Sequence, residues 1–324
     1  MNVTVVGAGG LGGYYGGLLA RAGWVVTFVA RGAHLEALRR QGGVRIHATH
    51  GEFLAPARAV ATPAEAPPAD LVLFTVKSFD TRAAAEALAA TLTPQTAVLS
   101  LQNGVDNEEV LAEVCGAGRV LGGAVYIFAT IAAPGAIAQT GGPRRVVFGE
   151  WPAGTSARVQ RLTQALRDAG WIVEPTDDIA REKWIKYTFI CAQAGMTALT
   201  RLPIGAIRDC PATWAMFRQI LEEVAAVGRA RGVRLPDDLI ERHLAFAQHL
   251  EPHGSSSLAA DLAQGKRLEI EALHGTVVRY GQALGIPTPA CAAVYAALLP
   301  HDAQARSATG RAPARRSSHL RASR

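Results

Sequence analysis

The chain has 324 residues, of which 49% are hydrophobic and 19% are charged, and it contains 33 glycines. This length predicts about two domains with substantial cores and excludes a disulfide miniprotein or a lone disordered segment. The sequence has no run of the roughly 18 to 20 apolar residues that a membrane-spanning helix needs. Its first residues lack the basic region of a signal peptide, so we expect a cytoplasmic protein.

The formal net charge of +6 is concentrated at one end of the chain. Residues 301–324 contain six arginines and one acid, so this tail carries +5 and the rest of the chain carries +1. A nearly neutral body lacks the basic surface that nucleic-acid binding requires, so we expect no nucleic-acid partner. The tail is rich in Ala, Ser and Arg, and we predict that 301–324 is disordered.

The four cysteines are scattered along the chain. None belongs to a C-x-x-C pair or lies at metal-ligand spacing from a histidine. We therefore predict reduced thiols, no disulfide and no metal site.

The first half of the sequence alternates short β-branched runs with helical stretches, which is typical of βαβ units. We predict an α/β domain over 1–175 with a doubly wound Rossmann-type parallel sheet. The predicted strands are 3–6, 25–30, 71–76, 97–101, 120–129 and 145–149. The predicted helices are 11–22, 34–41, 81–92 and 107–114.

After residue 175 the pattern becomes helical, with apolar residues at i, i+3, i+4 and i+7. We predict an all-helical C-terminal domain over 176–300. Its predicted helices are 178–199, 212–231, 237–250, 258–264, 269–284 and 290–299. The apolar helices 212–231 and 290–299 could supply the surface of a homodimer.

A G-x-G-x-x-G motif opens the chain. Gly7 suits a tight turn, Gly9 lets the backbone approach a pyrophosphate, and Gly12 allows close packing of helix and strand. Gly10 and Leu11 complete the turn that begins the helix, whose N-terminus favours phosphate. The motif follows a strand and precedes a helix, so it predicts dinucleotide binding.

Arg31 follows the second predicted strand, at the position where an NAD-selective protein usually has an acid. A guanidinium there can bind a 2′-phosphate, and we expect no nearby acid to compete for it. This favours NADPH, although a solvated arginine at a strand end is the alternative.

Lys77 and Asn103 follow two further predicted strands, where doubly wound sheets bind ligands. Lys77 could contact a cofactor phosphate or a substrate carboxylate, and Asn103 could bind nicotinamide or substrate. The alternatives are a surface lysine and a turn residue at an Asn-Gly step.

Together these motifs resemble the ketopantoate reductase (2-dehydropantoate 2-reductase) family. The resemblance extends over roughly residues 1–300 and keeps the family's order. Besides the glycine motif, it includes Val29-Ala30-Arg31-Gly32, Thr75 to Thr81 (TVKSFDT), Leu101-Gln102-Asn103-Gly104-Val105, Glu182 to Lys186 (EKWIK), Thr197-Ala198-Leu199, Ser256-Ser257-Leu258 and Glu269-Ile270-Glu271.

The resemblance implies a Rossmann domain, a helical domain and an active site between them. It implies NADPH-dependent reduction of 2-dehydropantoate to (R)-pantoate, a step in pantothenate biosynthesis. The implied catalytic residues are Lys186 and Glu269, and Lys186, Asn103 and Ser257 are implied to contact the substrate. Arg31, Lys77, Asn103 and Glu269 are implied on the cofactor side.

The chemistry of hydride transfer supports these roles. Hydride attack on a ketone builds negative charge on oxygen, which an ammonium such as that of Lys186 can stabilise and protonate. Lys186 lies in an apolar helix, where burial would lower its pKa. A surface lysine and an ordinary helix-face acid remain the alternatives for Lys186 and Glu269.

The sequence departs from the family at three positions. Well-known members have substrate-binding asparagines where this chain has Ile190, Ala194 and Ile204, which changes the expected pocket. Gln193 and Thr197 are candidates for compensating side chains. A reductase of a more apolar 2-oxoacid is therefore one alternative, and a non-catalytic NADP(H)-sensing regulator is another.

Overall fold

The computed structural model describes the backbone of residues 1–310 and the side chains of 1–308. The chain divides into two compact units. The first comprises Met1–Phe189 and Val224–Ile240, and the second comprises Ile190–Glu223 and the chain from Glu241 onward. The expected division into functional domains at residue 175 stays a prediction, and the two compact units do not follow it.

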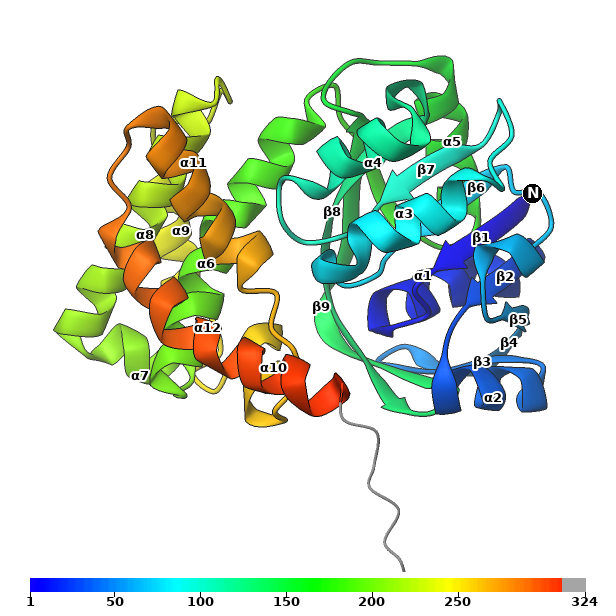
Figure 1. Ribbon diagram of the computed structural model, residues 1–324, viewed down its shortest axis with the longest axis horizontal. Coiled ribbons are helices and arrows are strands. Elements are labelled where there is room, and N and C mark those ends of the chain that lie inside the picture. The colour runs from blue at the N-terminus through cyan, green and yellow to red at the C-terminus, as the bar shows by residue number, and fades with distance from the viewer. Residues whose placement is uncertain (311–324) are drawn as a thin grey trace, which may run out of the picture. The chain divides into compact units, whose positions relative to one another are not determined.

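The first unit is built on one mixed sheet (Figure 1). Within the described residues the sheet has ten strands in the order β4-β3-β9-β8-β7-β6-β1-β2-β5, and β10 pairs with β9. The strands are β1 (Asn2–Val6), β2 (Val25–Val29), β3 (Gly43–Ala48), β4 (Gly51–Pro56), β5 (Arg58–Val60), β6 (Leu71–Phe74), β7 (Ala97–Ser100), β8 (Val120–Ala133), β9 (Ala136–Glu150) and β10 (Ile172–Pro175).

Six of these strands form a parallel sheet, and the sequence predicts all of them except β5. β5, β2, β1, β6, β7 and β8 are neighbours in that order, and each pair is parallel. β2 and β5 lie on one side of β1, although the chain forms β3 and β4 at the far edge of the sheet between them, and β6 lies on the other side of β1. The carboxyl end of β1 is therefore a topological switch point, where this class of sheet binds ligands.

The rest of the sheet differs from the prediction. β9 is antiparallel to β8, and β3 and β4 form an antiparallel pair that joins β9. The predicted strands 120–129 and 145–149 are parts of one long hairpin. β8 ends at Ala133, Pro134 and Gly135 form the turn, and β9 continues from Ala136 through Gly141 and Gly142 to Glu150.

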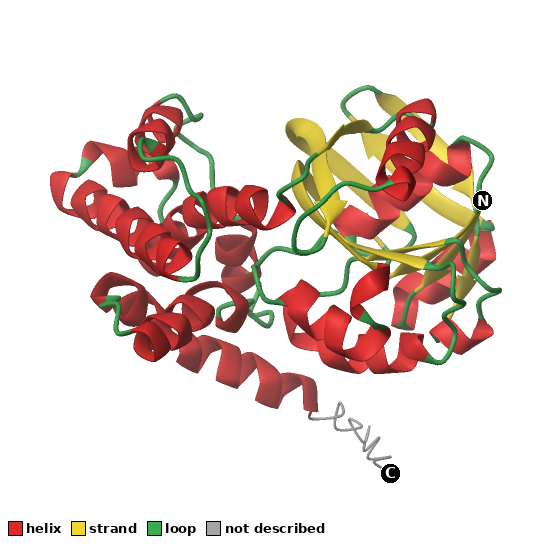
Figure 2. Ribbon diagram, turned by 90° about the horizontal axis from the view of Figure 1, so that it is seen from above, coloured by secondary structure: helices red, strands yellow, loops and turns green. Residues whose placement is uncertain are grey.

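Helices cover both faces of this sheet (Figure 2). Residues that alternate along the strands pack on opposite sides, so Leu71 and Leu73 belong to one core and Val72 and Phe74 to the other. The first core includes α1, α2 and α5, and the second includes α3 and α4. These helices are α1 (Gly10–Arg21), α2 (Gly32–Gln41), α3 (Thr81–Ala89), α4 (Asn107–Cys115) and α5 (Ala157–Asp168), with short helical turns η1 (Pro63–Glu65), η2 (Ser78–Asp80) and η3 (Ala117–Arg119).

The described residues of the second unit form helices and the loops between them, and they contain no strand. The helices after the sheet are α6 (Ile179–Thr200), α7 (Ile204–Asp209), α8 (Pro211–Ala230), α9 (Leu239–Gln248), α10 (Ser257–Ala263), η4 (Glu271–Gly275), α11 (Thr276–Leu284) and α12 (Pro289–Gly310). The predicted helix 269–284 begins later, as the π-helical turn η4, so Glu269 precedes it. Buried Glu223 of α8 holds the start of α12, because its carboxylate accepts hydrogen bonds from the amides of Ala290 and Cys291, each at 2.8 Å.

The predicted disordered tail begins too early. Helix α12 continues from Pro289 to Gly310, so residues 301–310 are helical, and residues 311–324 lie outside the described part. Contacts of Asp302 explain why α12 continues beyond residue 300. Its carboxylate is buried, accepts a hydrogen bond from the amide of Leu268 at 2.8 Å, and pairs with Arg306 at 3.1 Å.

All four cysteines, which lie in the described part of the chain, are free thiols. No helix among the described residues is both long and apolar enough to cross a membrane.

Candidate functional site

The glycine turn lies at the switch point, after β1. Gly7 has a φ of +102°, and a Cβ there would lie 2.7 Å from the amide nitrogen of Val76, so the turn requires glycine. A Cβ on Gly12 would clash with the carbonyl of Gly7 and the hydroxyl of Thr75. The sequence therefore places glycine where the backbone of α1 must approach the ends of β1 and β6.

Gly9 differs from its neighbours because a Cβ there would meet no atom within 4 Å. This residue caps the N-terminus of α1 without a side-chain hydrogen bond, and the first turn of the helix contains no acid. The first amides of a helix have no partner within that helix and bind anions, and Gly9 leaves space at this end of α1. The turn thus fits a pyrophosphate, and Gly9, Gly10 and Leu11 are the residues that would hold it.

Arg31 lies between β2 and α2, and its side chain is 86% exposed. The expectation that no acid competes for it is wrong, because its guanidinium forms an ion pair with Asp80 at the end of η2. The two residues are 49 positions apart, and the sheet order brings them together. β2 and β6 lie on either side of β1, so their carboxyl ends are near each other.

Lys77 is exposed and is the N-cap of η2, three residues after the end of β6. Gln102, which follows β7, fixes the neighbouring backbone. Its side-chain amide donates hydrogen bonds to the carbonyl of Val76 at 2.9 Å and to the hydroxyl of Thr81 at 2.8 Å. The loops after β6 and β7 are therefore joined beside the glycine turn.

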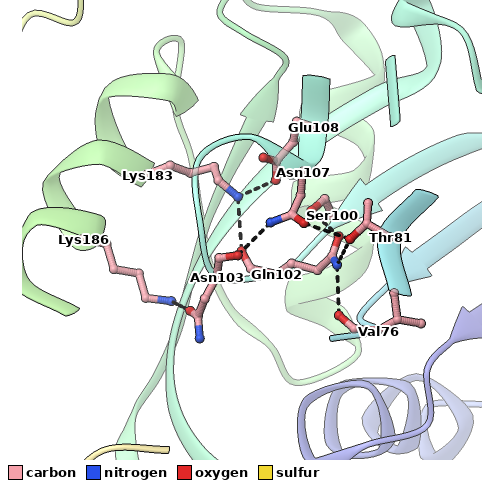
Figure 3. A network of polar contacts seen from close by, with 9 residues as sticks. All are labelled: Val76, Thr81, Ser100, Gln102, Asn103, Asn107, Glu108, Lys183 and Lys186. Atoms are coloured by element: carbon pink, nitrogen blue, oxygen red, sulfur yellow. Dashed lines mark hydrogen bonds and ion pairs between the residues drawn. The ribbon is translucent and has the colours of Figure 1, made fainter. Parts of the chain in front are cut away.

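The loop after β7 carries Asn103 and is held by a polar network (Figure 3). The hydroxyl of Thr81 donates to Oδ1 of Asn107 at 2.8 Å, and Nδ2 of Asn107 donates to the backbone carbonyl of Asn103 at 2.7 Å. Gly104 has a φ of +98°, which lets the chain turn directly after Asn103. Because its backbone is fixed on both sides, the side chain of Asn103 has a defined direction.

A buried ion pair anchors the same loop to α6. The ammonium of Lys183 contacts Oε1 of Glu108 and donates to the carbonyl of Gln102 at 3.2 Å. The two side chains are 2% and 0% exposed. Glu108 lies in the first turn of α4, where the helix dipole favours a carboxylate.

Lys186 lies one helical turn after Lys183 and points to the same loop (Figure 3). Its Nζ donates a hydrogen bond to Oδ1 of Asn103 at 2.7 Å. The same nitrogen lies 5.6 Å from the centre of the Tyr126 ring on β8, a cation–π distance. Burial raises the pKa of the Tyr126 phenol to about 12, so this ring is neutral at physiological pH.

These contacts define what the first unit can do chemically. A half-buried ammonium is held at the carboxyl end of the sheet by an amide oxygen and an aromatic face. Such a group can stabilise negative charge that develops on a carbonyl oxygen and can deliver a proton to it. It occurs in the same unit as a glycine turn that fits a dinucleotide.

Comparison with known proteins agrees with this geometry. The family "Ketopantoate reductase PanE/ApbA" matches residues 3–153, and "Ketopantoate reductase PanE/ApbA C terminal" matches residues 178–301. A 2-dehydropantoate 2-reductase of Archaeoglobus fulgidus is 34% identical over 285 residues, which are 88% of this chain and 92% of that protein.

A crystal structure of a PanE/ApbA family ketopantoate reductase from Ralstonia eutropha JMP134 has a TM-score of 0.87 and 38% identity. The match covers 94% of this chain and 99% of that one. The chain belongs to the ketopantoate reductase family. It is an oxidoreductase of the 2-dehydropantoate 2-reductase type and uses a nicotinamide cofactor, NAD(P)H.

The fold of this family also occurs in a protein whose name gives a different substrate. A D-mandelate dehydrogenase, solved with NADH and anilino(oxo)acetate, has a TM-score of 0.86 to this reductase but only 19% identity. The match covers 94% of this chain and 99% of that one. This likeness shows a shared fold, and it leaves the substrate to be inferred from the residues of this reductase.

The second unit of this reductase carries Ser257 and Glu269. Ser257 is exposed and is the first residue of α10, whereas its neighbour Ser256 caps that helix by accepting a hydrogen bond from the amide of Ala259 at 3.1 Å. Glu269 is half-buried in the segment before η4. Glu271 is engaged elsewhere, because it accepts a hydrogen bond from the Tyr295 hydroxyl at 2.7 Å. The expected roles of Ser257 and Glu269 stay predictions.

The positions that replace the family's asparagines are apolar and are shielded from solvent to different degrees. Ala194 and Ile204 are buried in the second unit, and Ile190 is half-buried. Thr197 is a poor substitute, because its hydroxyl donates to the carbonyl of Gln193 at 2.7 Å and lies 2.7 Å from the hydroxyl of Ser256. These contacts occupy the donor of the Thr197 hydroxyl, and the compensation expected from Gln193 and Thr197 stays a prediction.

Sequence reasoning missed four residues that organise the site: Asp80, Gln102, Glu108 and Lys183. Glu108 and Lys183 look like ordinary surface charges in a sequence. The sequence did contain one indication of the role of Lys183. Lys183 and Lys186 are three residues apart in a predicted helix, so they share a face of it.

Proposed function

We propose that this reductase converts 2-dehydropantoate to (R)-pantoate with NADPH, a step in pantothenate biosynthesis. The observation that carries the proposal is the 2.7 Å hydrogen bond between Lys186 and Asn103 in a member of this family. The names of relatives at about 30% identity support the substrate.

When bound, NADPH supplies a hydride to the carbonyl carbon of the substrate. The ammonium of Lys186 stabilises the charge that builds on the carbonyl oxygen and donates a proton to it, which gives the alcohol. Asn103 orients Lys186 through Oδ1. Glu269 and Ser257 bind substrate, and Glu269 also assists Lys186, as the family resemblance implies.

NADPH is proposed over NADH because of Arg31. Its exposed guanidinium follows β2, where the ribose of a dinucleotide lies in this class of fold, and it can form charge-assisted hydrogen bonds with a 2′-phosphate. Lys77, exposed after β6, adds a second positive charge on the cofactor side.

A second candidate is reduction of a bulkier, more apolar 2-oxoacid. It is favoured by Ile190, Ala194 and Ile204, and by the internal hydrogen bonds of Thr197. A site without the amides loses hydrogen bonds to substrate hydroxyl groups, which can change specificity by orders of magnitude.

One assay separates the candidates. NADPH oxidation is followed by absorbance with 2-dehydropantoate and a panel of branched and aromatic 2-oxoacids. Turnover of 2-dehydropantoate with the highest kcat/KM supports the proposal, whereas turnover of several apolar analogues with none on 2-dehydropantoate refutes it.

A variant tests the mechanism. Lys186→Met keeps an unbranched side chain that is one atom shorter and removes the proton donor, so we expect kcat to fall by roughly 10²- to 10⁴-fold while NADPH still binds. Unchanged reduction by this variant would refute the role of Lys186 and favour a cofactor-sensing regulator.

We infer a cytoplasmic location, supported by the four free thiols. A homodimer formed through the apolar helices over 212–231 and 290–299 stays a prediction, and light scattering of the purified protein tests it.

A further inference from the structure

The Arg31–Asp80 ion pair spans the carboxyl end of β1. Arg31 follows β2 and Asp80 ends the segment after β6, and β2 and β6 are the two neighbours of β1. The glycine turn follows β1 itself. The pair therefore lies over the place where a dinucleotide enters the first unit, on the side where its ribose is expected.

Apart from its ion pair with Arg31, the carboxylate of Asp80 makes no hydrogen bond or ion pair among the described contacts. Asp80 is the N-cap of α3, but its side chain accepts no capping hydrogen bond from that helix. Its side chain is 28% exposed and is held by Arg31 alone in the described hydrogen bonds and ion pairs. A carboxylate that does not cap the helix it precedes is available to a ligand.

The two nicotinamide cofactors differ where this carboxylate lies. The 2′-phosphate of NADPH carries about −1.5 to −2 charges, and Asp80 repels it while also competing with it for Arg31. NADH has a hydroxyl at the same position, and a carboxylate can accept a hydrogen bond from it. Arg31 favours one cofactor and Asp80 favours the other.

We propose that Asp80 is a specificity-determining residue that reduces the preference of this reductase for NADPH and admits NADH. The inference rests on the proposed function only in that a nicotinamide cofactor binds at the glycine turn. It concerns the balance between two cofactors, and it is independent of which 2-oxoacid is reduced.

Asp80→Asn tests this inference with little disturbance to the fold. The amide has the size of the carboxylate, and the helix loses no cap because Asp80 provides none. We expect NADPH to bind about tenfold more tightly to the variant, because one negative charge near the phosphate is removed. The gain should shrink as salt is raised from about 0.05 to 0.5 M, because salt screens exposed charges. NADH should bind equally well or up to a few-fold more weakly.

The measurement is a titration of cofactor fluorescence with the full-length protein, without substrate. Asp80→Ala is a second variant that removes the same charge. Glu113→Gln is the matched control, since Glu113 forms an exposed ion pair with Arg82 in the same unit and its substitution makes the same change in net charge. The control should leave both cofactor affinities within about twofold of the unmodified protein.

The outcomes distinguish this inference from the proposed function. Tighter NADPH binding in both Asp80 variants, and not in the control, supports it. Equal NADPH affinity in all four proteins, or an equal gain for NADPH and NADH, overturns it and leaves the reductase assignment intact. If the unmodified protein binds neither cofactor, the proposed function fails and this inference fails with it.

Discussion

The buried Lys183–Glu108 pair gives the sharpest prediction for stability. Lys183→Met leaves a carboxylate that is 0% exposed without its counter-ion. Removing one partner of such a pair costs about 3–5 kcal/mol, because a charge remains buried and uncompensated. Glu108→Leu leaves the ammonium of Lys183 with only the carbonyl of Gln102, so we expect a loss of the same size.

The double variant Lys183→Met, Glu108→Leu should be much less affected than either single variant. Oε2 of Glu108 has no hydrogen-bond partner among the described residues, so the pair does not fully compensate for the cost of burying two charges. An apolar pair of similar volume avoids that cost. We expect its free energy of unfolding to lie within about 1–2 kcal/mol of the unmodified protein.

Urea denaturation followed by circular dichroism measures these differences. The exposed Arg82–Glu113 pair is the matched control, with side chains that are 51% and 63% exposed, and its double-mutant cycle should give a coupling of at most about 1 kcal/mol. The reasoning fails if Lys183→Met costs less than about 1 kcal/mol, or if the double variant is as unstable as the worse single variant.

Substitutions at four further residues test other parts of the structure. Gly9→Ala should fold normally and bind NADPH at least tenfold more weakly, whereas Gly12→Ala should lose thermal stability, because only the second Cβ meets backbone atoms; cofactor titration and melting curves check both. His274 is fully buried and desolvation lowers its pKa to about 4. Neutral His274 therefore contributes in full to the free energy of unfolding above about pH 6.5, and this contribution of up to roughly 3 kcal/mol is lost as the pH falls toward 4. His274→Leu should flatten this part of the pH dependence of urea unfolding. Glu223→Ala should cost about 2 kcal/mol, because it leaves two buried amides of α12 without acceptors, and Glu223→Gln should cost less in the same denaturation assay.

Five strands of the parallel part of the sheet (β1, β2, β6, β7 and β8) could be predicted from sequence, since these buried strands are nearly continuous apolar runs. The segments β3, β4 and β5 could not, because they are short and mix polar and apolar residues over 43–60. Helix α5 was missed for a similar reason, since only a narrow stripe containing Val159, Leu162 and Leu166 is buried. In both cases the partner element, and not the local sequence, decides the structure.

The candidate site was predictable in part. Positions at strand ends pointed to Lys77 and Asn103, and the family resemblance pointed to Lys186, which does contact Asn103. The burial of Lys183 could not be read from the sequence, because its counter-ion is 75 residues away. The Arg31–Asp80 pair was missed for the same reason, since it depends on which strands flank β1.

The cofactor region has two parts that differ in how much substitution they tolerate. One is the face of α1 that lies on the sheet, and the other is the set of exposed strand ends. Gly13, Gly16 and Gly17 place the helix so close that a methyl group at any of them would press on Ile137, Phe28 or Ile46. These three side chains are fully buried and have little room to move away, so the helix that carries the phosphate-binding turn tolerates little change at these glycines. Divergence in cofactor choice within such a scaffold is then expected at exposed strand ends, where one substitution alters charge without moving the helix.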